Sequence, residues 1–160
     1  EQTALAEAEI EYLEKKSKAI YVKFPVINFM ENVNVIIWTT TPWTIPCNKA
    51  IAFSNDLKYS LIEIQKDIKN LSLKKNEKII LADNLVENFC TTHSIDNFSK
   101  LSTIDSEKLK QLKCQHPLRN LGFDNSVSLL EAEHVTDETG TGLVHIAPNH
   151  GVEDLSLIHI

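Results

Sequence analysis

Short apolar runs separated by polar turns recur along the chain, and they predict a domain built mainly from strands. Residues 19–26 (AIYVKFPV) combine β-branched and aromatic residues around a proline, which predicts a strand. Residues 35–38 (VIIW) are all apolar, which is typical of a strand buried on both faces. The same patterns predict further strands at residues 50–54, 57–65, 78–82, 126–135 and 142–146.

Helical patterns are fewer. Residues 3–18 place Ala, Leu and Tyr on one face and Glu and Lys on the other, which predicts an amphipathic helix. Asp83 is predicted to N-cap a second helix that ends near Thr92. Residues 101–114 alternate Lys with Leu and fit either an edge strand or a short helix. The side chains predicted to point inward from the second helix are Leu85, Val86 and Phe89.

These elements predict a β-rich α+β domain with short peripheral helices. Many short strands with one good helix favour a closed or semi-closed barrel. The polar helical segment at residues 1–18 is predicted to be a connecting arm, and residues 19–160 a single domain. No internal repeat and no linker divides the chain further.

Composition and charge narrow the functional classes. The chain has 160 residues and 42% apolar residues, enough for a packed core. Its net charge of −6 argues against binding nucleic acid by bulk charge, because phosphate binding depends on Lys and Arg. It leaves open a domain that receives one end of a nucleic acid held elsewhere. No apolar stretch is long enough to cross a bilayer, and three cysteines without close pairing indicate a reducing, cytoplasmic compartment.

The first candidate for chemistry is the string WTTTPWTIP at residues 38–46. Thr39, Thr40 and Thr41 follow an apolar strand, so their hydroxyls alternate between its two faces, and Trp38 and Trp43 flank them. The prolines of the string hold the chain on a rigid path out of the sheet. Such hydroxyls can position water or sugar and phosphate oxygens. The alternative is a Thr-rich edge strand with two core tryptophans.

The second candidate is the string GTGLVHIAPNHGVED at residues 140–154. A strand carrying His145 leads into a turn and a predicted helix start, which can bring His145, His150 and Asp154 to one pocket rim. A His–Asp pair can act as base and orienter, bind a metal, or recognise an amine. The alternative is a core histidine and an aspartate that caps a helix. The spacing matches no standard metal-ligand pattern, and neither a nucleophile elbow nor a phosphate-binding glycine loop is present, so no metal or cofactor is predicted.

The strings TTTPWTIPCNKAIA and GTGLVHIAPNHGVEDL resemble the editing domain of isoleucyl-tRNA synthetases, the connective insertion (CP1) of these class I enzymes. The opening TALAEAEIEY and the segment KAIYVKFPV are similar to the entry into that insertion, so the resemblance covers nearly the whole chain. The HIGH and KMSKS motifs of ATP-dependent aminoacylation are absent. The resemblance therefore implies an excised editing piece that does not activate amino acids.

The resemblance implies hydrolysis of valine misattached to tRNA(Ile). A pocket made for isoleucine rejects valine weakly, because one missing methylene is worth about 1–3 kcal/mol, a limit established for this family. A second pocket reverses the test by admitting the smaller side chain and excluding the larger. The implied partners are the 3′ end of tRNA(Ile) carrying valine and the remainder of the synthetase in cis. Cofactors and membranes are not implied.

Residue roles also follow from the resemblance. Asp154 stands where the family pairs a carboxylate with the substrate ammonium, a charge-assisted contact. His145 stands at the position that lines the side-chain pocket. Thr39, Thr40 and Thr41 stand at the run that holds the terminal adenosine and the attacking water.

The remaining candidates have weaker assignments. Trp38 and Trp43 either contact the adenosine or pack in the core, and His150 supports the turn at Asp154. The valyl and leucyl relatives carry Arg where Thr41 stands here. Two other functions stay open: a non-catalytic module that binds the tRNA acceptor end, and a structural spacer. Against the spacer stands the concentration of Trp, Thr, Gly and His in two strings.

Overall fold

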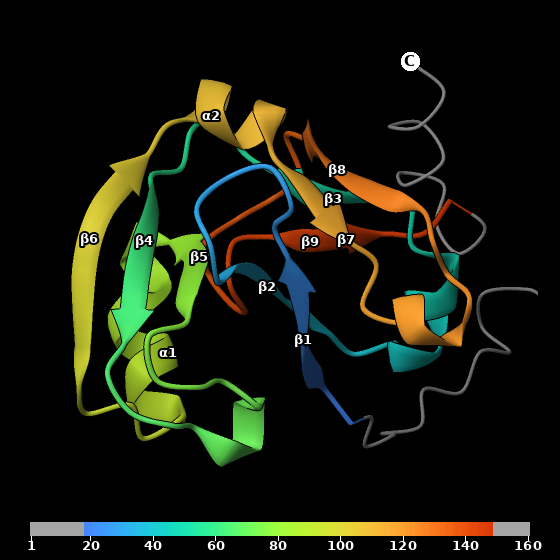
Figure 1. Cartoon of the computed structure of the whole chain (residues 1–160). Helices are drawn as coiled ribbons and strands as arrows, with labels where there is room; N and C mark the ends of the chain where they lie inside the picture. The colour runs from blue at the N-terminus through green and yellow to red at the C-terminus, as the bar shows by residue number, and fades with distance from the viewer. Residues whose placement is uncertain (1–17, 149–160) are drawn as a thin grey trace, which may run out of the picture.

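A computed structural model describes residues 18–148, and its strands form two sheets in that part of the chain. The two sheets lie side by side in Figure 1, with β6, β4 and β5 at the left and β7, β8, β3 and β9 at the upper right. In spatial order, the larger sheet consists of β1 (Ile20–Pro25), β2 (Val33–Thr39), β5 (Lys78–Ala82), β4 (Tyr59–Ile64) and β6 (Phe98–Ile104). The smaller sheet consists of β7 (Lys113–Gln115), β8 (Ser126–Glu131), β3 (Ala50–Phe53) and β9 (Val144–Ile146).

Pairing in both sheets is mixed. β2 pairs antiparallel with β1 and parallel with β5. β3 pairs parallel with β8 and antiparallel with β9, which places His145 opposite Ile51. The β-rich α+β class predicted from the sequence is confirmed, whereas the closed barrel is not: the described strands remain in two separate sheets.

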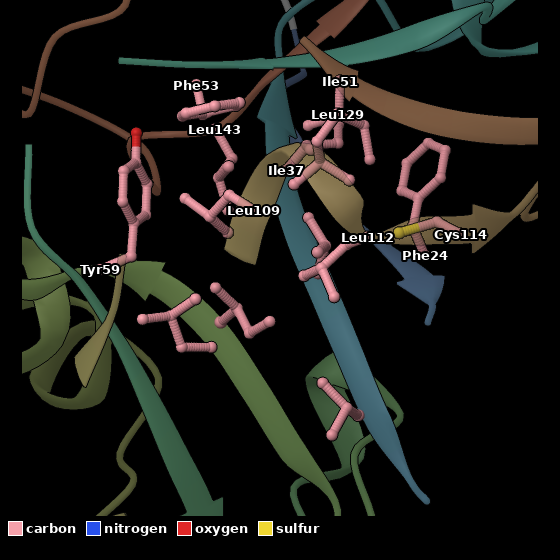
Figure 2. Packing of buried hydrophobic residues seen from close by; sticks show 14 of the residues in the cluster. Phe24, Ile37, Ile51, Phe53, Tyr59, Leu109, Leu112, Cys114, Leu129 and Leu143 are labelled. Carbon is pink, nitrogen blue, oxygen red and sulfur yellow. The ribbon is translucent and has the colours of Figure 1, made fainter. Parts of the chain in front are cut away.

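The larger sheet is covered on both faces, which explains its continuous apolar runs. Val35 and Ile37 of β2 belong to the main core, while Ile36 between them belongs to a second cluster on the opposite face. Ile80 and Ile79 of β5 divide in the same way. Figure 2 shows the main core between the sheets, where Ile37 and Tyr59 face residues of the smaller sheet such as Ile51 and Phe53.

Helices in the described residues are short. The α-helices are α1 (Val86–Thr92) and α2 (Ser106–Gln111), and 3₁₀ helices span Pro42–Cys47, Lys69–Leu71, Asp83–Leu85 and Arg119–Leu121. α1 buries Val86 and Phe89 against the larger sheet, and Leu85 just before it is buried too, as predicted; Cys90 is also buried. The ambiguous residues 101–114 contain the end of β6, α2 and the start of β7. No helix of the described residues is long and apolar enough to cross a membrane.

Two predictions about helices, at Asp83 and at residues 3–18, are not confirmed. The prediction that Asp83 N-caps the helix is wrong, because its carboxylate does not accept from the helix backbone. Instead it accepts from the Ser60 hydroxyl and the Lys100 ammonium, both brought to it by neighbouring strands. The helix predicted at residues 3–18 falls almost entirely outside the described residues, so the division into an arm (1–18) and a domain (19–160) stays a prediction.

Candidate functional site

A cavity of about 400 Å³ opens where the two sheets meet. Its described lining comes from three stretches: residues 38–44 at the end of β2 and just after it, residues 134–142 before β9, and β9 with its neighbours. We call residues 39–44 the threonine segment and residues 134–142 the glycine segment. A cavity of this volume has the size of a small-molecule site.

Side-chain hydroxyls lock the threonine segment. The Oγ1 of Thr39 accepts from the Thr41 backbone N–H at 3.1 Å and lies 3.2 Å from the Thr41 hydroxyl. The Thr44 hydroxyl donates to the Thr41 carbonyl at 2.8 Å. Thr39 and Thr44 are buried, whereas Thr40 and Thr41 are exposed. Because β2 ends at Thr39 and both Thr40 and Thr41 are exposed, the predicted alternation of the three hydroxyls does not extend through Thr41. The backbone turns there into a 3₁₀ helix that contains both prolines of the string.

His145 is the main buried polar side chain of the cavity floor. Its Nε2 lies 2.6 Å from the Thr44 hydroxyl, and its Nδ1 lies 2.9 Å from the Asn48 amide nitrogen. Since that amide nitrogen is a donor, Nδ1 accepts, and the proton of the neutral ring lies on Nε2. The ring is 8% exposed and held at both nitrogens, so it forms a wall of fixed shape.

The threonine segment is supported from beneath by His116. This buried ring donates from Nε2 to the Ile45 carbonyl at 3.1 Å and accepts at Nδ1 from the Leu118 backbone N–H. Burial lowers the pKa of His116, so the neutral ring is the form that the fold selects. The 3₁₀ helix is thereby attached to the loop that follows β7.

The glycine segment is held mainly by its backbone. Gly142 has φ +69°, and a Cβ there would lie 2.4 Å from Cβ of Ala82, so the close approach requires glycine. The Thr141 carbonyl accepts from the Ala82 N–H, and the Gly142 carbonyl accepts from the Tyr59 hydroxyl at 2.8 Å. Burial raises the pKa of Tyr59 to about 12, so the phenol remains a donor. At the other side of the loop, the Asn84 amide donates to Asp137 at 2.6 Å.

The two tryptophans line the cavity in different ways. Trp38 is half-buried and packs closely against the glycine segment, because a Cβ added at Gly140 would lie 3.2 Å from the Cβ of Trp38. Trp43 is 67% exposed at the cavity mouth. The interpretation of residues 38–46 as an edge strand with two core tryptophans is therefore wrong, since β2 lies between β1 and β5 and Trp43 is outside the core.

The structure brings together six of the predicted site residues around one cavity. They are Trp38, Thr39, Thr40, Thr41, Trp43 and His145. His150 and Asp154 lie outside the described residues, so their predicted places remain predictions. Sequence reasoning missed Thr44 and Asn48, the two partners of the His145 ring, because 101 and 97 positions separate them from it. It also missed His134 on the opposite wall.

Uncharged groups dominate the described lining. Among its residues none is Lys, Arg, Asp or Glu, and the two histidines are the only titratable side chains. Within residues 18–148 no group of three or more His, Cys, Asp or Glu side chains is placed to hold a metal ion. What the described walls offer is a set of threonine hydroxyls, a fixed imidazole and an exposed indole.

Solved structures identify the fold. The crystal structure of GlLeuRS-CP1 is similar with a TM-score of 0.69 at 18% sequence identity, over 87% of this chain and 58% of that one. The P. knowlesi cytosolic leucyl-tRNA synthetase editing domain is similar with a TM-score of 0.64 at 12% identity, over 86% of this chain and 59% of that one. The fold is therefore that of the CP1 editing domains of aminoacyl-tRNA synthetases.

Sequence relatives narrow the class to one family. No family model matches the chain. The isoleucine–tRNA ligase of Agrobacterium fabrum is 46% identical over 157 residues, which covers 96% of this chain and 16% of that protein. That of Pelagibacter ubique is 44% identical, covering 98% and 17%. Over nearly its whole length the chain is therefore similar to one part of isoleucine–tRNA ligases, as its two strings suggested, and it spans about one sixth of the length of these curated relatives.

Proposed function

We propose that the chain is an editing domain that hydrolyses the ester between misattached valine and the terminal adenosine of tRNA(Ile). The observation that carries the proposal is the cavity between the threonine and glycine segments, with hydroxyls on one wall and a fixed imidazole on its floor. The similarity to isoleucine–tRNA ligases and the CP1 fold support it. The activity belongs to a class in which modest catalysis suffices, because the ester is already activated.

The threonine segment is assigned the positioning of the attacking water. Thr39 and Thr41 form a hydroxyl pair 3.2 Å apart, and the backbone beneath them is locked by Thr44. Threonine hydroxyls do not ionise near neutral pH, so they orient the water and the ester without removing a proton. We propose that the neighbouring ribose hydroxyl of the substrate relays the proton: it accepts from the attacking water and passes its own proton to the ribose oxygen that leaves as the ester C–O bond breaks, so that free valine and an intact ribose are released.

His145 is assigned the exclusion of isoleucine. A ring that is free to rotate yields to one more methylene, whereas this ring is held at Nε2 by Thr44 and at Nδ1 by Asn48. The discrimination then depends on the steric cost of displacing a hydrogen-bonded wall. Asp154 is proposed to pair with the substrate ammonium, with His150 supporting its turn, and Trp43 to stack on the adenosine.

The partners follow from the family. We infer that the tRNA 3′ end enters the cavity while the rest of a synthetase, linked in cis, holds most of the tRNA; residues 1–18 are the proposed connecting arm. The net charge of −6 supports this division, since few phosphates are held by the chain itself. We propose a cytoplasmic location. The chain alone should bind tRNA weakly, and more weakly still as the salt concentration rises. Tight binding of tRNA by the chain alone at physiological salt would contradict the proposal that the rest of the synthetase holds most of the tRNA.

A single-turnover deacylation assay tests the proposal. The chain is mixed in excess over valyl-tRNA(Ile) or isoleucyl-tRNA(Ile), so that weak binding does not limit the rate. Valyl ester should disappear faster than in buffer, and isoleucyl ester should not. Asp154→Ala should abolish the acceleration, while the control Asp124→Ala, at an exposed carboxylate away from the cavity, should not. Equal rates with and without the chain favour the non-catalytic binding module instead.

A further inference from the structure

The cavity has a buried floor and an exposed mouth. The floor is formed by buried groups that include Thr39, Leu143 and His145. The mouth is formed by exposed side chains, among them Trp43 and His134. An aminoacyl nucleotide at the end of an RNA fits this arrangement in one direction, with the ester inside and the sugar–phosphate chain leaving through the mouth.

A phosphate at the mouth is held best by a donor that can also carry positive charge, because a charge-assisted hydrogen bond is stronger than one from a neutral hydroxyl. No Lys or Arg lines the described walls. The ring nitrogens of His145 are held by Thr44 and Asn48 at the floor. His134 is therefore the one described lining side chain at the mouth that is able to carry a positive charge.

The backbone fixes where His134 lies. Val135, the next residue, is 4% exposed and packs with Ala132 and Ile146 in a small core cluster. His134 and Thr136 flank it, both are exposed, and both line the cavity. The Ala132 N–H donates to the Phe53 carbonyl at 2.8 Å, so this part of the glycine segment begins from an anchored strand end.

We propose that His134 and Thr136 form a pair of donors for the phosphate on the 5′ side of the terminal adenosine, an inference that rests on the proposed function. An imidazole N–H and a hydroxyl two positions apart, on either side of a buried residue, are suited to one phosphate group. The pair orients the incoming RNA end, while the threonine segment on the opposite wall positions the ester.

Binding of adenosine 5′-monophosphate and of adenosine tests the pair, because the two probes differ only in the phosphate. Both tryptophans of the chain line the cavity, so intrinsic fluorescence reports on it. Wild type should bind the monophosphate about five- to tenfold more tightly than adenosine. His134→Ala should remove about fivefold of that difference and Thr136→Val about twofold, with adenosine binding unchanged. Glu133→Gln, an exposed neighbour outside the cavity lining, is the matched control.

Three results overturn the pair: no preference of the wild type for the monophosphate, no binding of it at about 10 mM, or equal weakening of both probes by His134→Ala. The deacylation assay on the same wild-type preparation separates this outcome from the fate of the proposed function. If the chain prefers the monophosphate through His134 but hydrolyses no ester, the phosphate-binding pair is upheld and the proposed editing activity is contradicted. If the chain hydrolyses the valyl ester but shows no preference for the monophosphate, the editing activity is upheld and the pair is contradicted.

Discussion

The two walls of the cavity are built in opposite ways. In the threonine segment, the buried hydroxyls of Thr39 and Thr44 both hydrogen-bond to the backbone of Thr41: the first accepts from its N–H and the second donates to its carbonyl. In the glycine segment the backbone is anchored near its end by Tyr59 and Ala82, while side chains such as His134 stay exposed. The threonine segment is therefore a fixed surface against which an ester can be placed. The glycine segment has exposed side chains that can contact a ligand entering the cavity.

The largest effect should come from the end of the glycine segment. Gly142→Ala places a Cβ 2.4 Å from that of Ala82 at a φ of +69°, so strain and overlap add. We expect a loss of about 3 kcal/mol in the free energy of unfolding, measured by urea denaturation. Gly122→Ala is the matched control, because φ there is +94° and nothing lies within 4 Å. It should cost about 1 kcal/mol, and equal costs at both positions would show that the approach to Ala82 does not matter.

The next effect tests the locked wall. Thr44→Val keeps the shape of the side chain but removes the partner of His145 Nε2 and the donor to the Thr41 carbonyl. We expect a loss of about 2 kcal/mol in stability, since the buried ring N–H loses its hydroxyl partner, and about a tenfold fall in the deacylation rate. The control Thr92→Val, on the exposed face of α1, should change stability by less than about 0.5 kcal/mol. If the deacylation rate of Thr44→Val is unchanged, the hydrogen bonds of Thr44 to His145 and to the Thr41 carbonyl are not needed for hydrolysis.

Acid should weaken the supports of the two walls in different pH ranges. Burial lowers the pKa of His116 below the usual histidine value of 6.5, so the unfolded chain binds more protons and stability is lost as the pH falls below about 6.5. Hydrogen bonds from Lys100 and Ser60 lower the pKa of Asp83, next to Ala82, below 3.8. The stability due to Asp83 is therefore present above about pH 4 and is lost only as the pH falls through its lowered pKa.

Urea denaturation across pH 3–8 measures both contributions. His116→Gln should flatten the decline below pH 6.5, leaving the share of His93, whose pKa burial also lowers. Asp83→Asn should flatten only the decline at the acid end. If His116→Gln leaves the curve between pH 7 and pH 5 unaltered, the neutral ring does not support the threonine segment.

The smallest effect concerns the exposed side of the glycine segment. Asn84→Ala removes one hydrogen bond, of 2.6 Å, to Asp137. We expect a loss of about 0.5 kcal/mol, together with faster amide hydrogen exchange confined to residues 134–139. Asn125→Ala, an exposed asparagine outside both segments, is the control. Faster exchange throughout β9 as well would mean that the two parts of this wall are not independent.

Local patterns were sufficient for most of the strands. Residues 78–82 coincide with β5, and residues 19–26 contain β1, because alternating or continuous apolar runs report burial directly. Two errors share a different cause. Asp83 is held by Ser60 and Lys100 rather than by a helix, and the described strands form two sheets rather than a closed barrel. Both depend on pairings between distant parts of the chain, which no local pattern encodes.

The candidate site divides in the same way. The strings at residues 38–46 and 140–154 pointed to Thr39 and His145, because unusual residues are concentrated there. Thr44 and Asn48 were not predicted, although both lie in or beside the first string, because their role depends on the His145 ring about 100 positions away. A threonine or asparagine in such a string has many possible partners, and only the fold selects one.

The central claim is that an aminoacyl ester occupies the space between the two walls. A crystal structure of the chain with a non-hydrolysable valyl-adenosine analogue tests it directly. The account predicts the valyl side chain at the floor beside His145, the ester near Thr39 and Thr41, and the adenine against Trp43. Binding of the analogue elsewhere on the molecule, or in the reverse direction with the adenine at the floor, would contradict it.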